Sequence, residues 1–210
     1  MPIVTAITMQ VKDKNRVNVF IDGDFCCGLL LETVMKYKLK VGDTITRDNL
    51  AQIQYDSEKS KALNISVSYL SRSMKTQKQI EKYLTDKGYG NTVIFFVIEK
   101  LKEYGYIDDS IYAKTYIKSY ISKKGKKLIE YELISKGIAN SDIEKAYLMI
   151  EESEERLPNN PALSLAEKYM KNKPCDNATI QKLYRHLLSK GFDYDEVKSA
   201  VSKYKESQDD

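Results

Sequence analysis

The spacing of apolar residues along the chain changes near residue 48. Before that point apolar and polar residues alternate in two runs, Ile7, Met9 and Val11, and then Val17, Val19 and Ile21. Because successive side chains on a strand point to opposite faces, each run predicts a strand with one buried face. Asp22-Gly23 predicts a tight hairpin turn, since glycine accepts positive φ. A short helix over 29–39 is expected to follow.

The string Lys-Gly-apolar occurs three times in the helical part of the chain. It stands at Lys87-Gly88-Tyr89, Lys136-Gly137-Ile138 and Lys190-Gly191-Phe192, with glycines 49 and 54 residues apart. Apolar residues recur at six offsets from each glycine: eight and four before it, and six, nine, ten and thirteen after it. The first two lie on one face of a helix that the glycine ends, and the others form the stripe of the next helix. The sequence therefore predicts three internal repeats.

Polar residues mark the expected helix starts. Thr76-x-x-Gln79, Ser141-x-x-Glu144 and Asp193-x-x-Glu196 have capping-box spacing, and Asn91 precedes another stripe. One more helix is expected before each pair, over 62–71, 110–121 and 162–169. The predicted fold is mainly α, with three tandem three-helix repeats behind a small N-terminal β-rich module. The expected divisions are 1–50 for the module and 51–107, 108–157 and 158–206 for the repeats.

Composition narrows the function classes. The 210 residues include one histidine, His186, and only three cysteines, which argues against His-based catalytic sites and metal sites. Adjacent Cys26 and Cys27 would point to opposite faces of a strand and cannot chelate one ion together. No apolar run reaches the roughly 18–20 residues that cross a bilayer, and the N-terminus lacks a signal-peptide pattern. We expect a cytoplasmic monomer that is not an enzyme, with no catalytic residue, metal, cofactor, membrane contact or small-molecule substrate.

The net charge of +4 is unevenly distributed. Residues 61–130 carry 14 basic and 7 acidic residues, and residues 131–160 carry 3 and 7. The basic charge is densest at Lys123, Lys124, Lys126 and Lys127, around Gly125. Such a cluster is either a solvated loop or the contact surface for an anionic partner. The acidic stretch 151–161 is either a solvated linker, or an electrostatic mimic or intramolecular brake on a basic surface.

Two segments of the helical part carry a more specific pattern. The first runs Tyr69-Leu-Ser-Arg72-Ser-Met-Lys-Thr76-x-x-Gln79 and continues to Lys87-Gly88; the second is Gly105-Tyr106-Ile107-Asp108-Asp109-x-x-Tyr112-Ala113. Together they resemble the RecX family, the regulators of the bacterial recombinase RecA. The resemblance covers about residues 60–206. It implies a non-enzymatic protein that binds RecA filaments on single-stranded DNA and restrains their ATPase, strand exchange and coprotease activities. Contact with DNA would be indirect or weak.

The hypothesis assigns a basic face on the first two repeats to this filament. Its candidate residues are Arg72, Lys75, Lys78, Lys82, Lys118, Lys123, Lys124, Lys126 and Lys127. The expected structural caps are Gly88, Gly105, Gly137, Gly191, Asp108 and Asp109. Lys75, Lys78 and Lys82 are spaced to share one side of a helix.

Three tyrosines spaced four apart, Tyr112, Tyr116 and Tyr120, either pack in the core or form a platform for a partner.

Two other functions stay open. One is a free-standing, non-sequence-specific DNA-binding protein, and the other is a protein–protein scaffold.

Overall fold

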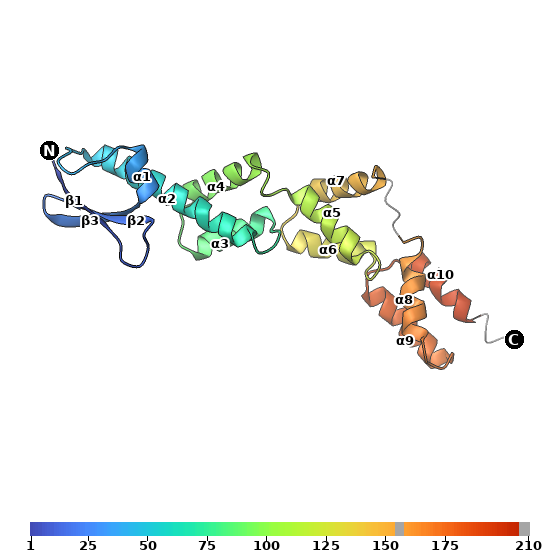
Figure 1. The fold of residues 1–210 in the computed structure, drawn as a ribbon. Coiled ribbons are helices and arrows are strands. Elements are labelled where there is room, and N and C mark those ends of the chain that lie inside the picture. Colours follow the sequence, from blue (N-terminus) through green and yellow to red (C-terminus); the bar gives the residue numbers. More distant parts are fainter. Residues whose placement is uncertain (154–157, 206–210) are drawn as a thin grey trace. The chain divides into compact units, whose positions relative to one another are not determined.

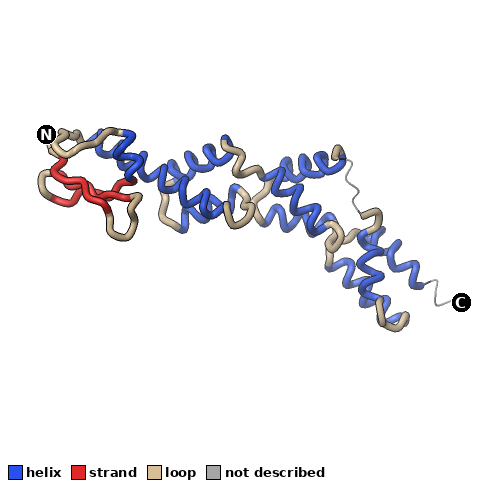
Figure 2. Tube along the Cα trace, in the orientation of Figure 1, coloured by secondary structure: helices blue, strands red, loops and turns tan. Residues whose placement is uncertain are grey.

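The computed structural model describes residues 1–153 and 158–205, and its chain divides into two compact units. The first unit contains residues 1–74 and 80–106, and the second contains 75–79 and 107–210. Strands occur only near the N-terminus of the described chain, and the rest is helical (Figures 1 and 2). The expected fold class, a mainly α chain with a small N-terminal β module, is confirmed.

The N-terminal sheet is antiparallel, in the order β1-β2-β3. Its strands are β1 (Val4–Met9), β2 (Arg16–Ile21) and β3 (Asp24–Leu30), and α1 (Leu31–Lys36) follows directly. The expected turn is present, with φ of 52° at Asp22 and 94° at Gly23. Two expectations were wrong. Val11 lies outside β1 and is exposed, as is Met9, and residues 29–30 finish β3 instead of starting the helix.

Helix α2 (Arg47–Leu70) starts where the sequence becomes helical but is one continuous helix of 24 residues. The expected helix over 62–71 is only its last part. The buried positions of α2 are Ile53, Ser57, Ala62 and Ser66, so half of them are polar and periodicity of apolar residues misses them. Ser57 Oγ accepts the Leu30 backbone N–H at 2.8 Å, which joins α2 to the sheet.

The remaining helices follow the repeat pattern. They are α3 (Gln77–Asp86) and α4 (Asn91–Glu103), then α5 (Asp109–Tyr120), α6 (Lys126–Ser135) and α7 (Asn140–Glu151), and finally α8 (Pro161–Met170), α9 (Asn177–Ser189) and α10 (Tyr194–Lys205). Of the eighteen apolar positions at the six offsets, sixteen are buried. Tyr147 and Tyr204 are the exceptions, and both pack against a core from its edge.

Glycine ends the helices as predicted. Gly88, Gly105, Gly137 and Gly191 all have φ between 68° and 89°, the left-handed region that a side chain disfavours. The next backbone N–H closes each turn; Tyr106 N, for example, donates to the Leu101 carbonyl at 2.8 Å.

The helix starts were predicted less well. Capping boxes form at Thr76 with Gln79 and at Asp193 with Glu196. Asn91 and Ser141 instead lie inside their helices, because Gly90 and Ala139 occupy the cap positions. The acidic stretch 151–161 includes residues 154–157, so its expected role falls partly outside the described residues.

Candidate interaction surface

The basic loop between α5 and α6 is held against the turn that follows α9. The Gly125 N–H donates to the Lys190 carbonyl at 2.8 Å, and Gly125 is buried. A Cβ on Gly125 would overlap the backbone of Gly191 and Phe192. This close approach fixes the position of the loop and of the lysines on both sides of Gly125.

Lys124 points back onto the second repeat. Its ammonium is 2.6 Å from a Glu132 carboxylate oxygen and 4.2 Å from the centroid of the Tyr120 ring. Tyr116 donates its hydroxyl to the same carboxylate at 2.6 Å. Burial raises the pKa of Glu132, but the hydrogen bonds from Lys124 and Tyr116 outweigh it and lower that pKa below its usual value. Lys124 is therefore part of an internal network.

The other three lysines are all exposed but differ in their partners, and Lys126 and Lys127 are the first two residues of α6. Lys126 lies 3.9 Å from Glu130 and 4.7 Å from the centroid of the Tyr147 ring. Lys123 and Lys127 are exposed, and neither forms an ion pair with a described residue. Of the four lysines around Gly125, Lys123 and Lys127 are therefore the exposed ones without an ion pair to a described residue.

The candidates near α3 do not form the expected stripe. Because Thr76 caps α3, the helix begins at Gln77, so Arg72 and Lys75 precede it. Lys78 lays its methylene chain over Gly137, although the residue as a whole is exposed. Lys82 is exposed on the helix, and Lys118 is half-buried on α5.

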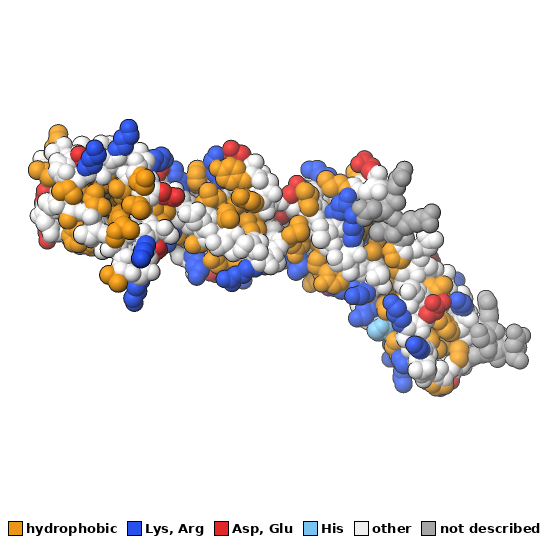
Figure 3. Space-filling model, in the orientation of Figure 1, with side chains coloured by type: hydrophobic (Ala, Val, Ile, Leu, Met, Phe, Trp, Pro, Cys, Tyr) orange, Lys and Arg blue, Asp and Glu red, His pale blue; other side chains and the backbone are white. Residues whose placement is uncertain are grey.

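Lys and Arg side chains occur in several separate groups on the face drawn in Figure 3, with hydrophobic side chains between them. Arg72 and Lys82 belong to the first unit, whereas Lys75, Lys78 and the candidates from Lys118 onward belong to the second.

Asp108 and Asp109 cap different helices. Asp108 caps α5 by accepting the Ile111 N–H at 2.9 Å, as expected. Asp109 is the first residue of α5 and accepts the Gln77 N–H, at the start of α3, at 2.9 Å. The expectation that both cap α5 was wrong for Asp109, because a carboxylate in a helix's first turn can reach a neighbouring helix start.

Each repeat carries an aromatic contact that the sequence did not reveal. The residue five before the repeat glycine touches a tyrosine of the preceding helix. Tyr83 stacks on Tyr69 with centroids 4.2 Å apart, Glu132 accepts from Tyr116, and His186 stacks on Tyr169 at 4.8 Å. Because the residue at this position is Tyr, Glu or His, comparing residue types does not reveal that the three make equivalent contacts. Tyr112 and Tyr120 flank Tyr116 and pack against the same core.

His186 gives a pH prediction. Burial, then the charges of Lys190 and Lys173, lower its pKa below the usual value of about 6.5. A depressed pKa in the folded state means that the unfolded chain binds the proton more tightly. Stability of the third repeat should therefore be fully present above about pH 6.5 and fall as pH drops through the folded pKa.

As the only histidine, His186 has an imidazole resonance that needs no assignment in an NMR titration. We expect a midpoint below 6.5. His186→Tyr, which copies the first repeat, should remove this part of the acid sensitivity. A midpoint at or above 6.5 would contradict the stacked, cation-flanked environment.

Among the described residues, no group of three or more His, Cys, Asp or Glu side chains is arranged to hold a metal ion. No helix in the same part of the chain is long and apolar enough to cross a membrane.

Comparison with known proteins accounts for most of the chain. Residues 2–46 match the regulatory protein RecX N-terminal domain, and residues 62–101, 108–146 and 162–201 match the first, second and third three-helix domains of RecX. A regulatory protein RecX from Clostridium botulinum strain Alaska E43 is 33% identical over 205 residues, covering 96% of this chain and 95% of the relative. One from Clostridium perfringens strain SM101 is 34% identical, covering 94% of each chain.

Two solved structures share the fold. A crystal structure of regulatory protein RecX has a TM-score of 0.71 at 26% identity and covers 96% of this chain and 100% of its own. The RecX structure from Lactobacillus salivarius has a TM-score of 0.60 at 28% identity, covering 70% and 97%. The resemblance seen in the sequence is thereby confirmed: the chain belongs to the RecX family of regulatory proteins.

Proposed function

We propose that this chain binds RecA and RecA filaments on single-stranded DNA, and that binding inhibits their recombinase, ATPase and coprotease activities in DNA repair. Membership of a family of regulatory proteins supports the regulatory part. The main structural support for an interaction site is the basic segment around Gly125. Its hydrogen bond to Lys190 fixes the loop, and Lys123 and Lys127 remain exposed.

Two exposed lysines on a positioned backbone suit a protein or nucleoprotein surface. Cations on an ordered segment lose less backbone freedom on binding than cations on a free loop. Such charges attract acidic or phosphate surfaces and set the orientation of the complex. Inhibition by this protein would then require no catalytic activity, because the bound protein blocks movement of the filament subunits. The proposal accordingly includes no catalytic residue, cofactor or small-molecule substrate.

A second candidate function is direct binding of single-stranded DNA. The aromatic contacts of the three repeats favour it, since each lies beside a lysine. Lys87 is 5.7 Å from the Tyr83 centroid, Lys136 is 5.6 Å from that of Tyr116, and Lys173 is 3.2 Å from that of Tyr169. Rings next to cations are the components of single-strand binding surfaces.

Binding measured with and without RecA separates the two. We expect the chain to bind a RecA-coated oligonucleotide more tightly than the bare one in fluorescence anisotropy. Binding to the bare strand should fall steeply between about 50 and 200 mM salt, as phosphate contacts do, and filament binding less steeply. Equal affinity and equal salt dependence for the two would favour the DNA-binding function and contradict ours.

We further propose that the chain acts as a cytoplasmic monomer. The four-part division at 1–50, 51–107, 108–157 and 158–206 also stays a prediction.

A further inference from the structure

Two of the three Lys-Gly turns are covered by the start of another helix. After α6, the Lys136 carbonyl accepts the Thr76 hydroxyl at 2.8 Å, and the Lys78 side chain covers Gly137. Thr76 caps α3, and Lys78 is in the first turn of that helix.

The turn after α9 is covered in the same way. The Lys190 carbonyl accepts the Gly125 N–H at 2.8 Å, and Leu128 covers Gly191. Gly125 is the cap residue of α6, and Leu128 is in its first turn. In both cases a cap residue bonds the lysine carbonyl and a first-turn side chain lies over the glycine. The chain thus uses one docking arrangement twice.

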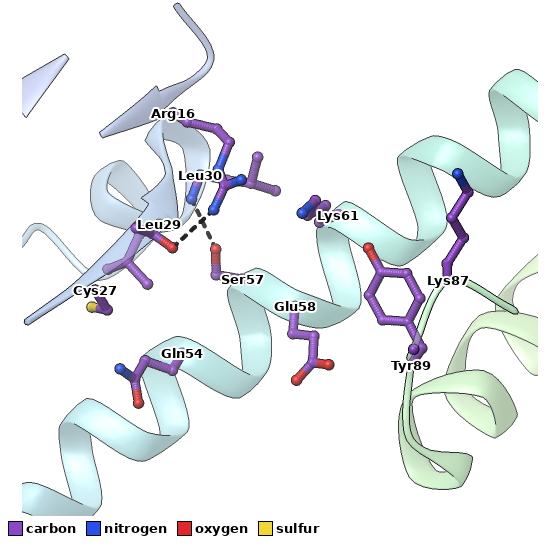
Figure 4. Close-up of a pocket in the computed structure, with 12 residues that line it drawn as sticks. Arg16, Cys27, Leu29, Leu30, Gln54, Ser57, Glu58, Lys61, Lys87 and Tyr89 are labelled. Carbon is purple, nitrogen blue, oxygen red and sulfur yellow. Dashed lines mark hydrogen bonds between the residues drawn. The ribbon is translucent and has the colours of Figure 1, made fainter. Parts of the chain in front are cut away.

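The turn after α3 has the same backbone but lacks a cover. Gly88 has φ of 84°, close to the 89° and 83° of Gly137 and Gly191, and Tyr89 N donates to the Leu84 carbonyl at 3.1 Å. A Cβ on Gly88 would meet no atom within 4 Å among the described residues. This turn lines a pocket of about 390 Å³ in the first unit, between α2 and the end of the sheet (Figure 4).

Positive charge dominates this pocket. Arg16, Lys61 and Lys87 line it against a single carboxylate, Glu58. Figure 4 shows the Glu58 carboxylate directed away from Arg16 and Lys61. Arg16 Nη2 donates to the Gly28 carbonyl at 3.3 Å, while its buried Nε has no hydrogen-bond partner within the described structure. That Nε is closed to solvent, but Arg16 lines the pocket, and a guanidinium is the side chain that pairs best with a carboxylate.

We propose that this pocket binds the N-terminal turn of a helix from a partner protein whose cap or first turn carries Asp or Glu. The two covered turns indicate what kind of segment binds, since each contacts the start of a helix. The three cations of the pocket favour a negatively charged segment. Asp and Glu are also favoured in the cap and first turn of a helix. The cap residue would bond the Lys87 carbonyl, a first-turn side chain would lie over Gly88, and the carboxylate would meet Arg16. This site lies in the first unit and does not depend on the basic loop.

A peptide titration of the full-length, ¹⁵N-labelled chain tests the proposal. The probe is a synthetic helical peptide with Asp at its cap and Glu three residues later, and its control carries Ser and Gln at those positions. We expect the acidic peptide to shift the amide resonances of Gly28, Gly88 and Tyr89 and to bind at least about tenfold tighter than the control.

A matched pair of variants tests the place of binding. Gly88→Asn puts a side chain into the pocket, and asparagine tolerates positive φ better than other residues with a side chain. Gly105→Asn is its control, because Gly105 also has positive φ, 68°, and open space around it. Gly88→Asn should weaken peptide binding at least about tenfold, and Gly105→Asn should leave it unchanged.

Four outcomes would overturn the proposal. They are the absence of peptide shifts, equal loss in both variants, equal or larger shifts with inorganic phosphate or a single-stranded oligonucleotide, and concentration-dependent self-association that Gly88→Asn abolishes. The last two would identify the occupant as a phosphate group or as a second copy of this chain.

Discussion

Gly125→Ala is expected to destabilise the packing of the second repeat on the third by about 2–3 kcal/mol, at the upper end of the cost of an overpacked site. The added Cβ would overlap backbone atoms of Gly191 and Phe192, which cannot move aside as a flexible side chain would. The hydrogen bond from Gly125 N to the Lys190 carbonyl would lengthen or break as the two segments separate.

Gly90→Ala is the matched control. Gly90 caps α4 with φ of −73° and ψ of 156°, and Gly125 caps α6 with −72° and 161°. A Cβ on Gly90 meets open space. Both substitutions therefore carry the same cost at the cap, below about 1 kcal/mol, and only one carries the overlap.

Hydrogen exchange of the α6 and α9 amides is the suitable measurement, because a chain of two units has no single free energy of unfolding. We expect protection in both helices to fall for Gly125→Ala and to stay unchanged for Gly90→Ala. Equal, small effects from both variants would show that the loop does not contact the turn after α9.

Lys123→Gln/Lys127→Gln is expected to raise the concentration needed for half-inhibition of RecA's DNA-dependent ATPase by about tenfold. That figure corresponds to about 0.7 kcal/mol for each exposed charge pair lost. Both side chains are exposed, Lys123 in the loop and Lys127 in the first turn of α6, and the position of the loop does not depend on them, so the fold should be unaffected.

Lys12→Gln/Lys14→Gln makes the same change in net charge at two other exposed lysines, in the segment between β1 and β2. Inhibition should be unchanged in this control. Lys124 is left intact in both variants, because removing it would leave Glu132 without its ion pair and confuse folding with binding. Equal loss in the two variants would point to net charge, and full inhibition by Lys123→Gln/Lys127→Gln would remove the loop from the interface.

Apolar spacing predicted the repeats well because each repeat buries the same positions. Ile80, Ile129 and Leu183 are all fully buried, as are Leu84, Leu133 and Leu187. The left-handed glycines were predictable for a related reason, since a helix that must turn sharply into the next needs a residue without a Cβ. Local pattern and tertiary packing agree at these sites.

Prediction failed where polar groups do the packing. Ser57 and Ser66 occupy buried positions of α2, and Asp109 caps a helix other than its own. A charge count treats all four lysines around Gly125 alike, but Lys124 pairs with Glu132 and the exposed Lys126 lies beside Glu130, whereas Lys123 and Lys127 are exposed without an ion pair to a described residue. The partners in these contacts are set by tertiary packing, and a hydrophobic pattern does not encode them.

Titration of the full-length chain into a RecA ATPase assay on single-stranded DNA tests the central claim most directly. We predict that ATP hydrolysis falls as the chain approaches stoichiometric ratios to RecA, and that Lys123→Gln/Lys127→Gln shifts this curve to higher concentration. An ATPase rate that the unmodified chain leaves unchanged at those ratios would contradict the proposed function.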